Sequence, residues 1–353
     1  MILAASVLSV PCQSHSREWL FCLFITVSLA ACSGETVPTQ LAGATMGTTW
    51  HVSYLPAVST PAVEDLRLGI EAQLEHVNSS MSTYRPDSEI SRFNAFDSGE
   101  WFIASPDFFR VLTTALNIGQ LSEGAYDVTV APLVDLWGFG PDGIVDEPPS
   151  PHEIALLMPQ VGQNKLKVDA ERFGVMKRSA LTVDFSSLAK GFAVDLVAEW
   201  LLAQGIEGFM VEVGGEMRLS GLSGRGDPWR IAIEQPEISR REVATAVSLS
   251  DVALATSGGY RNYFELNGQH YSHSIDPHTG YPVAHDLVSV TVVHSSCMIA
   301  DAWATALTVL GAERAMAVAK TQGLAVYFIR RAEDGFEQSH TPHFSRYLGE
   351  PQQ

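Results

Sequence analysis

A carboxylate and a hydroxyl stand four residues apart in an apolar segment near the C-terminal end of the chain. Asp301 and Thr305 belong to Ala300–Leu307 (ADAWATAL), a small-residue stretch predicted to be helical, so both side chains share one helix face. Burying these two groups without a partner is costly, and a cation would be such a partner. The pair therefore indicates the metal corner of a phosphate-handling site. The alternative is an ordinary helix with a capped or internally hydrogen-bonded pair.

A polar loop lies just before this helix. It opens the stretch Tyr271–Leu307 and carries His273 and Asp276, and an alternating apolar strand, Val288–Val293, separates it from the helix. A loop with titratable side chains therefore precedes the predicted metal site in the sequence.

A second group of chemical residues sits where a predicted strand runs into a predicted helix, at Asp184–Gly191 (DFSSLAKG). Backbone N–H groups at a helix start favour an anion, and Lys190 would reach the same anion. Asp184 would accept a ligand hydroxyl or N–H group. The alternative is a helix cap with solvated charges. Two Gly-rich turns, Val213–Glu216 and Thr256–Tyr260, follow apolar strands, but such turns are common and each alone is weak evidence.

Composition limits the classes of ligand. The chain has 353 residues, of which 46% are hydrophobic and 18% charged, as in a globular protein. Lys and Arg number 22 against 40 Asp and Glu, giving a net charge of -18, which argues against binding to a nucleic-acid backbone. An anionic ligand must then be held locally, by backbone N–H groups, a lysine or a metal ion. The sequence has no Walker loop, no GxGxxG after a strand, no HExxH and no zinc-type histidine spacing.

The N-terminal segment resembles a bacterial lipoprotein leader. An apolar run, Trp19–Ala31, follows Arg17 and ends in Leu29-Ala30-Ala31-Cys32, which is similar to a lipobox whose cysteine is diacylated. The alternative is an ordinary signal peptide with an incidental cysteine. Cys297 would be the only thiol left in the folded body, and we assign it no catalytic role. The expected organisation is a leader at 1–31, a lipidated tether at 32–40 and one domain at 41–350.

The pattern of the body predicts an α+β fold with mixed or antiparallel sheets and packed helices, not a regular βαβ alternation. Asn267-Gly268 between alternating runs predicts a hairpin, and the apolar loop Ala125–Gly143 is expected to line a cleft or pack beneath one. Further predicted strands are Met46–Tyr54, Lys165–Val168, Gly174–Lys177, Leu181–Phe185, Phe209–Val213, Met217–Leu222, Trp229–Glu234, Ala244–Leu249 and Ala325–Arg330. Predicted helices are Val63–Met81, a short one from about Ser88, Pro106–Leu121, Glu153–Met158, one ending at Leu202, and Ala312–Thr321.

Taken together, these segments resemble the ApbE family, the periplasmic FAD:protein FMN transferases. The resemblance covers essentially the whole body in order, and its specificity comes from the combination. The matching blocks are TMGTTW (Thr45–Trp50), STYRPDSEISRFN (Ser82–Asn94), GAYDVTVAPLVDLWGFGP (Gly124–Pro141), VDFSSLAKGFAVD (Val183–Asp195), VEVGGE (Val211–Glu216), ATSGGYRNYFE (Ala255–Glu265), SHSIDPHTGYPV (Ser272–Val283) and ADAWATALTVLG (Ala300–Gly311). The resemblance implies an ApbE-like, T-fold-related architecture with an FAD site in a central cleft.

The resemblance also implies a reaction. The pyrophosphate of FAD, the substrate, is split, the FMN half is attached through a phosphoester to a Thr or Ser of a target protein, and AMP leaves. Mg²⁺ would be held by Asp301, Thr305 and a third oxygen from Ser187, its backbone carbonyl. The family histidine implicated in transfer corresponds to His273, which would take the proton of the incoming hydroxyl or hold a phosphate oxygen. An exposed loop histidine without a role is the alternative.

Family contacts to FAD fall on one further set of positions. Met46 and Tyr84 are suited to packing on flat rings, although Met46 would equally serve as strand core. Ser274 departs from the family, where a β-branched apolar residue is commoner, and this departure bears on the fit to the ligand. The implied FAD contacts are Met46, Tyr84, Ala125, Tyr126, Asp127, Asp184, Lys190 and Ile275.

The implied partners are FAD and acceptor proteins with a threonine in a D-G-x-T-G-A-T-like segment, such as subunits of Na⁺-pumping NADH:quinone reductase or Rnf-type complexes. The chain is expected on the periplasmic side of a bacterial membrane, touching the membrane only through its lipid anchor. Two other functions stay open. One is a Mg²⁺-dependent FAD pyrophosphatase, with water in place of the acceptor; the other is a non-catalytic lipoprotein that stores FAD.

Overall fold

The computed structural model describes residues 36–349, except 58, 141, 142, 144, 146, 237–242, 259–262 and 267–268, and gives only the backbone of 263–266 and 269–270. The described residues belong to one compact unit, Glu35–Gln353. The expected leader, Cys32 and the first part of the expected tether lie outside the described residues. Within the described part of the chain, no helix is both long and apolar enough to cross a membrane.

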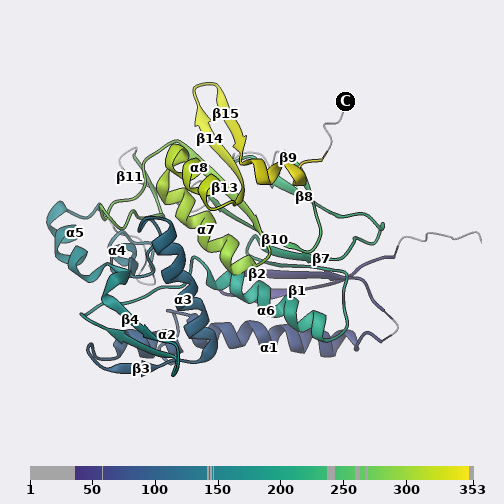
Figure 1. Cartoon of the computed structure of the whole chain (residues 1–353), viewed down its shortest axis with the longest axis horizontal. Helices are drawn as coiled ribbons and strands as arrows, with labels where there is room; N and C mark the ends of the chain where they lie inside the picture. The colour runs from purple at the N-terminus through teal and green to yellow at the C-terminus, as the bar shows by residue number, and fades with distance from the viewer. Residues whose placement is uncertain are drawn as a thin grey trace, which may run out of the picture. The chain divides into compact units, whose positions relative to one another are not determined.

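An eight-stranded sheet forms the centre of this unit, and all of its neighbouring strands are antiparallel. This confirms the predicted α+β class (Figure 1). The strands, in spatial order, are β1 (Thr39–Thr45), β2 (Thr48–Tyr54), β6 (Phe209–Val213), β7 (Glu216–Ser220), β10 (Val252–Gly258), β13 (Leu287–His294), β14 (Ala325–Ala332) and β15 (Gly335–His340).

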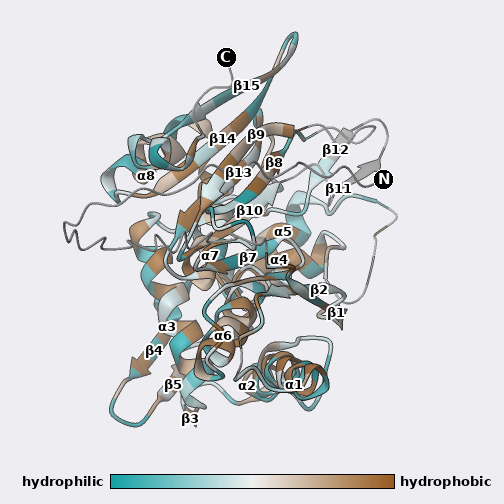
Figure 2. Ribbon diagram, turned by 90° about the vertical axis from the view of Figure 1, so that its right-hand side faces the viewer, coloured by the Kyte–Doolittle hydropathy of each residue, from teal (hydrophilic) through white to brown (hydrophobic). Residues whose placement is uncertain are grey.

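The two faces of the sheet bury different cores, because successive residues of a strand point to opposite sides. On β10, Ala253 and Ala255 belong to the larger core under the helices, while Leu254 between them belongs to a second core. On β15 most residues are exposed, and Figure 2 shows this strand largely in the hydrophilic colour. The helices that contribute to the larger core include α1 (Val63–Met81), α3 (Pro106–Leu121), α6 (Ala189–Ala203), α7 (Cys297–Leu310) and α8 (Ala312–Thr321).

Three smaller sheets complete the fold. The pair β8 (Trp229–Glu234) and β9 (Val243–Leu249) contributes to the second core. The predicted hairpin is confirmed in its strands, β11 (Tyr263–Leu266) and β12 (Gln269–Ser272), while its turn lies outside the described residues. The remaining elements are β3 (Trp101–Ile103), β4 (Leu166–Asp169), β5 (Gly174–Lys177), α2 (Glu89–Ala95), α4 (Ala131–Leu136), α5 (Pro151–Leu157) and three short 3₁₀ turns, Met158–Gln160, Gln163–Lys165 and Pro342–Tyr347.

Several predicted elements differ from the structure. The strand predicted to begin at Met46 begins at Thr48, because Met46 (φ 49°) and Gly47 (φ 70°) form the turn of the β1–β2 hairpin. β1 itself begins at Thr39, inside the predicted tether, where Thr39 pairs with Tyr54.

Two predictions between the hairpin and α6 also need correction. The strand predicted at Leu181–Phe185 is absent: its backbone bonds instead to a side chain, Val183 N–H to Asn94 Oδ1 at 2.8 Å, and to a loop carbonyl. The predicted loop Ala125–Gly143 contains a short helix, α4, whose second residue is Pro132. A proline in the first turn of a helix needs no N–H partner. Pro132, which suggested a loop in the sequence, therefore lies at the start of a helix.

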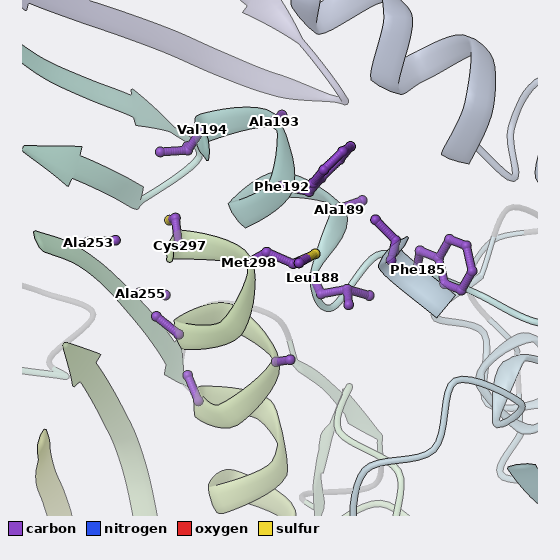
Figure 3. Packing of buried hydrophobic residues seen from close by; sticks show 14 of the residues in the cluster. Phe185, Leu188, Ala189, Phe192, Ala193, Val194, Ala253, Ala255, Cys297 and Met298 are labelled. Atoms are coloured by element: carbon purple, nitrogen blue, oxygen red, sulfur yellow. The ribbon is translucent and has the colours of Figure 1, made fainter. Parts of the chain in front are cut away.

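The helices α6 and α7 cross closely, and this crossing positions the site described below. A Cβ atom on Gly191 would lie 2.5 Å from the backbone oxygen of Cys297, so only glycine allows this approach. Small residues on β10, Ala253 and Ala255, lie beside the start of α7 (Figure 3). The N-terminus of α6, with Lys190, is thereby brought against the face of α7 that carries Asp301.

Asp195, on α6, fixes the start of α7. Its buried carboxylate accepts hydrogen bonds from the backbone N–H groups of Cys297 (3.0 Å) and Met298 (3.1 Å), from Ser296 Oγ (2.7 Å) and from Arg218 Nη1 (3.0 Å). A negative charge at a helix N-terminus also interacts favourably with the helix dipole. Asp195 therefore ties α6, α7 and β7 together at one point.

Candidate functional site

One large cavity, of about 1750 Å³, takes its walls from segments that are far apart in the sequence. It is lined by the β1–β2 turn, the segment before α4, the start of α6, the β6–β7 turn, the end of β10, the loop after β12 and α7. All of the predicted site residues of the body line this cavity: Met46, Tyr84, Ala125, Tyr126, Asp127, Asp184, Ser187, Lys190, His273, Ile275, Asp301 and Thr305. Cys32 lies outside the described residues.

A charged cluster occupies the part of the cavity at the α6–α7 crossing. Lys190 Nζ lies 3.3 Å from Glu216 Oε1 and 3.7 Å from Asp301 Oδ2, and Asp301 Oδ2 also accepts the backbone N–H of Gly191 at 3.1 Å. Asp301 and Glu216 are almost fully buried, whereas Lys190 keeps part of its surface toward the cavity. Two carboxylates therefore face a single ammonium group.

Burial sets the proton affinities of this cluster. It raises the pKa of Asp301, and it raises the pKa of Glu216 to about 8, although Lys190 acts in the opposite direction on both carboxyl groups. The pKa of Lys190 lies above its ordinary value, because the two carboxylates outweigh the burial that disfavours its charge. The cluster accordingly keeps Lys190 charged, while burial disfavours the charged forms of the two carboxyl groups.

The donor set fits a divalent cation with a preference for oxygen. Among the described residues, Glu216 Oε2 is a buried atom without a hydrogen-bond partner, and Asp301 has no cationic neighbour other than the Lys190 that it shares with Glu216. Thr305 Oγ1 lies 3.2 Å from Ser257 Oγ on the same wall. The described residues contain no cluster of three His, Cys, Asp or Glu side chains, so hydroxyl and carbonyl oxygens must complete such a site.

Ser187 contributes differently from Asp301. Its Oγ lies 2.8 Å from the hydroxyl of Tyr126, which is buried, and burial raises the pKa of the Tyr126 phenol. The Ser187 hydroxyl is thus already hydrogen-bonded. The expected contribution of the Ser187 backbone carbonyl to a cation stays a prediction.

Several backbone N–H groups near the start of α6 already have partners within the protein. The backbone N–H groups of Leu188 and Ala189 both donate to the carbonyl of Phe185, at 3.0 and 2.7 Å, and the N–H of Gly191 donates to Asp301. The turn tightens in this way because Leu188 at the N-cap offers no capping side chain. These three N–H groups are therefore already occupied, and the Lys190 side chain is a cationic group on this wall of the cavity.

The predicted flavin contacts lie along the cavity with different degrees of exposure. Tyr84 is 72% exposed, so its ring is open to solvent and to a ligand. Met46 is half-buried in its turn and packs against the core. Asp127 accepts three hydrogen bonds that hold its own loop, from the N–H and Oγ1 of Thr129 and from the N–H of Gln163. The Asp127 side chain thus shapes the wall of the cavity.

His273 and Ile275 reach the cavity from the loop after β12. The His273 ring meets the ring of Phe139 edge to face, with centroids 6.3 Å apart. Ile275 is buried in a small core with Trp137, whose Nε1 donates to the carbonyl of Gly280 at 2.9 Å. The loop is therefore fixed on the segment that follows α4. His273 and Asp301, which are 28 residues apart in the sequence, both line the cavity.

Two polar residues at the charged cluster had no assigned role in the sequence. Glu216 follows a Gly-Gly turn, and Ser257 lies near the end of an apolar strand. The sequence places each of them only in a Gly-rich segment, without indicating a role. Glu216 on β7 meets Lys190 on α6, and Ser257 on β10 meets Thr305 on α7. The two contacts lie close together because β7 and β10 are neighbours in the sheet. The feature of the sequence that could have identified both residues is a polar side chain next to a glycine turn and a buried strand.

Solved structures with this fold belong to a class of flavin transferases. The structure described as "Flavin Transferase ApbE from Vibrio cholerae" superimposes with a TM-score of 0.82 at 44% identity, covering 88% of this chain and 100% of that one. The apo form of the Pseudomonas stutzeri flavinyl transferase ApbE gives the same TM-score at 39% identity, covering 89% of this chain and 97% of that one.

Sequence comparison gives the family. Residues 46–328 match the model of the ApbE family, and the chain belongs to that family. Among its relatives, the FAD:protein FMN transferase of Vibrio cholerae is 45% identical over 332 residues, covering 94% of this chain and 99% of the relative. The resemblance read from the sequence is confirmed.

Proposed function

We propose that this chain is an FAD:protein FMN transferase, an enzyme that moves the FMN half of FAD onto a threonine or serine hydroxyl of a target protein. The observation that carries the proposal is the buried cluster of Lys190 with two carboxylates, in one cavity with His273. Relatives of this chain described as FAD:protein FMN transferases support it. FAD is the substrate, and the acceptor is a second protein.

The proposed step exchanges one phosphorus–oxygen bond for another. The acceptor hydroxyl oxygen bonds to the phosphorus of the FMN half, the bond from that phosphorus to the bridging oxygen breaks, and AMP leaves with the electron pair. His273 takes the hydroxyl proton, since a histidine titrates near neutral pH. Phosphoryl transfer depends mainly on in-line positioning and charge neutralisation, which suits a site built around charge.

Asp301, Thr305 and Ser187 would hold Mg²⁺ in this proposal. The ion supplies neutralisation of phosphate charge when bound, which a chain of net charge -18 needs in addition to Lys190. Lys190 binds a phosphate oxygen through the part of its side chain that faces the cavity. Met46, Tyr84, Ala125, Tyr126, Asp127, Asp184 and Ile275 form the walls that receive the rest of FAD.

The location and partners of the chain are part of the proposal. Diacylated Cys32 anchors the body on the periplasmic side of a bacterial membrane, which would place it beside membrane-bound acceptors. Subunits of Na⁺-pumping NADH:quinone reductase or Rnf-type complexes fit this description. The feature that the family resemblance implies for such acceptors is a threonine in a D-G-x-T-G-A-T-like segment.

The test combines the chain with FAD, Mg²⁺ and an acceptor protein that contains a D-G-x-T-G-A-T-like segment. We expect covalent in-gel flavin fluorescence on the acceptor, and Asp301→Ala should lower the Mg²⁺-dependent rate at least about 100-fold, because charge stabilisation at the transition state is lost. Asp286→Ala, which removes an exposed carboxylate outside the cavity, is the matched control.

Other outcomes separate the competing functions. FMN and AMP formed at full rate without an acceptor, with no labelled acceptor, would identify a pyrophosphatase. Bound FAD without turnover would identify a storage protein. An unchanged rate in Asp301→Ala would remove Asp301 from the metal site.

A further inference from the structure

Lys190 lies between two buried carboxylates and is closer to one of them. Its Nζ is 3.3 Å from Glu216 Oε1 and 3.7 Å from Asp301 Oδ2. Asp301 uses the same oxygen, Oδ2, to accept the backbone N–H of Gly191 at 3.1 Å. Among the described residues, no hydrogen bond or ion pair involves Asp301 Oδ1, and Asp301 lines the cavity. Asp301 therefore keeps one oxygen that the protein does not occupy.

The β6–β7 turn fixes the stem of Lys190 as well as its charged end. A Cβ atom on Gly214, in this turn, would lie 3.3 Å from Lys190 Cδ, so the turn passes directly beside the stem. The N–H of Gly215 holds the turn in place by donating to Glu212 Oε1 at 2.6 Å. Glu216 follows the turn directly and begins β7. One segment of the chain thus contacts both the stem and the ammonium group of Lys190.

Glu216 has few partners of its own. Its Oε1 meets Lys190, and its Oε2 is a buried atom without a hydrogen-bond partner among the described residues. Asp195, a buried carboxylate on the same helix as Lys190, instead accepts four hydrogen bonds. A buried carboxylate with an unpaired oxygen costs stability. The position of Glu216 is therefore better explained by its effect on Lys190 than by a contribution to the fold.

That effect bears on any cation at Asp301. An ammonium group and a divalent cation that share one carboxylate repel each other, and the repulsion is stronger in a buried site than in water. Without the charge of Glu216, Asp301 would be the one remaining carboxylate within 4.0 Å of Lys190 Nζ in the part of the chain that the structure describes. Lys190 would then compete with the cation for Asp301.

From these contacts we infer that Glu216 is a positioning residue, which holds the Lys190 ammonium group away from Asp301 and so keeps Asp301 available to a divalent cation. Glu216 acts through Lys190 and touches neither the cation nor the phosphate. In its place beside Glu216, the Lys190 side chain is still 28% exposed and lines the cavity, where a phosphate oxygen can reach it. This inference rests on the proposed transferase function, in which Asp301 holds Mg²⁺ and Lys190 binds a phosphate oxygen.

Binding of Mn²⁺ to the full chain without FAD tests this role apart from catalysis. Mn²⁺ favours the same oxygen ligands as Mg²⁺, and the EPR signal of free Mn²⁺ gives its dissociation constant. The site at Asp301 is the one that is lost in Asp301→Ala. Glu216→Gln keeps the size of the side chain but removes its charge, so that Lys190 turns to Asp301. The dissociation constant of that site should rise about tenfold or more.

Glu212→Gln is the matched control. Glu212 lies on β6, just before the same turn, but does not line the cavity, and its side chain meets His51 and the N–H of Gly215. A glutamine oxygen still accepts the N–H of Gly215, so the turn is kept while a nearby negative charge is lost. Because Glu212 does not contact Lys190 or Asp301, the dissociation constant should change less than about twofold.

A double-mutant cycle with Lys190→Met separates an action through Lys190 from a direct attraction of the ion by Glu216. In Lys190→Met there is no ammonium group to hold, so adding Glu216→Gln should leave the dissociation constant within about twofold. A loss of the same size in both backgrounds would show that Glu216 attracts the ion directly and would overturn the positioning role. Melting curves check that the variants fold, and Lys190→Gln replaces Lys190→Met if the methionine variant does not.

The results separate the positioning role from the proposed function. An unchanged dissociation constant in Glu216→Gln, or no Mn²⁺ binding by the unaltered chain, overturns the positioning role even if flavin is transferred to an acceptor. The expected cycle without any covalent flavin on the acceptor would support the positioning role and contradict the transferase proposal.

Discussion

At the scale of single residues, Met46 combines an unfavourable backbone with a place on the cavity wall. Its φ of 49° lies in the left-handed region, which costs a side chain with a Cβ roughly 1–2 kcal/mol. The pair Met46-Gly47 makes a two-residue hairpin turn, for which Asn-Gly is a preferred sequence. A methionine that keeps this conformation is better explained by a contact with a ligand than by stability.

Met46→Asn separates these two effects. Asparagine tolerates the left-handed region, so we expect the free energy of unfolding to rise by up to about 1 kcal/mol in urea titrations. Loss of the apolar contact should raise the KM for FAD severalfold. Leu68→Asn, at an exposed position on α1, is the control for removing an apolar side chain outside the cavity. A variant with unchanged FAD affinity would show that Met46 serves the turn alone.

The polar and titratable residues of the candidate site were largely predictable from the sequence. The side chains that they contact were not. Asp301 and Thr305 share a helix face by spacing alone, and both line the cavity. Glu216 was missed because its contact with Lys190 depends on how the start of α6 lies against β7, which no local pattern encodes. Local rules also do not show that Asp301 would reach the N–H of Gly191 at the start of α6.

At the scale of elements, the position of α7 relative to α6 decides whether Lys190 and Asp301 can act together. The long and periodic elements were predicted well: α1, α3, α8 and β6 have the expected bounds. The short strands β5 and β8 also have the expected bounds, whereas the strand predicted at Leu181–Phe185 is absent because its backbone bonds to Asn94. The α6–α7 crossing could not be predicted at all, because it depends on Gly191 meeting a backbone carbonyl far along the chain.

Asp195→Asn tests whether this crossing sets the proposed metal site. The amide keeps the size of the carboxylate but puts donors against the N–H groups of α7 and removes the charge opposite Arg218. We expect the free energy of unfolding to fall by about 3 kcal/mol, and the Mg²⁺ concentration for half-maximal rate to rise severalfold. The first is measured by urea denaturation and the second by steady-state kinetics.

Glu199→Gln is the matched control, because Glu199 lies 3.7 Å from the same Arg218 Nη1 but is about half exposed. Exposed ion pairs contribute roughly 0–1 kcal/mol, so both readouts should change little. A loss of stability in Asp195→Asn without any change in Mg²⁺ dependence would limit Asp195 to holding the fold.

At the scale of the whole molecule, the site and the proposed anchor must work together. A body that carries a net charge of -18 has little intrinsic attraction for an anionic membrane surface, so proximity to membrane-bound acceptors must come from elsewhere. Diacylation of Cys32 would supply it, since two acyl chains give stable anchoring where one is marginal. A short tether before β1 would keep the cavity near the membrane.

Cys32→Ala should therefore release the protein from the membrane without altering its chemistry. We expect loss of metabolic labelling with a radioactive fatty acid and a shift from the membrane to the soluble fraction, while the rate of flavin transfer to an acceptor peptide in solution stays the same. Cys297→Ala is the matched control, because Cys297 is the free cysteine of the described residues and is fully buried. It should keep both lipid and membrane association. A Cys32→Ala protein that stays in the membrane fraction would place the anchor elsewhere and leave the lipoprotein proposal without support.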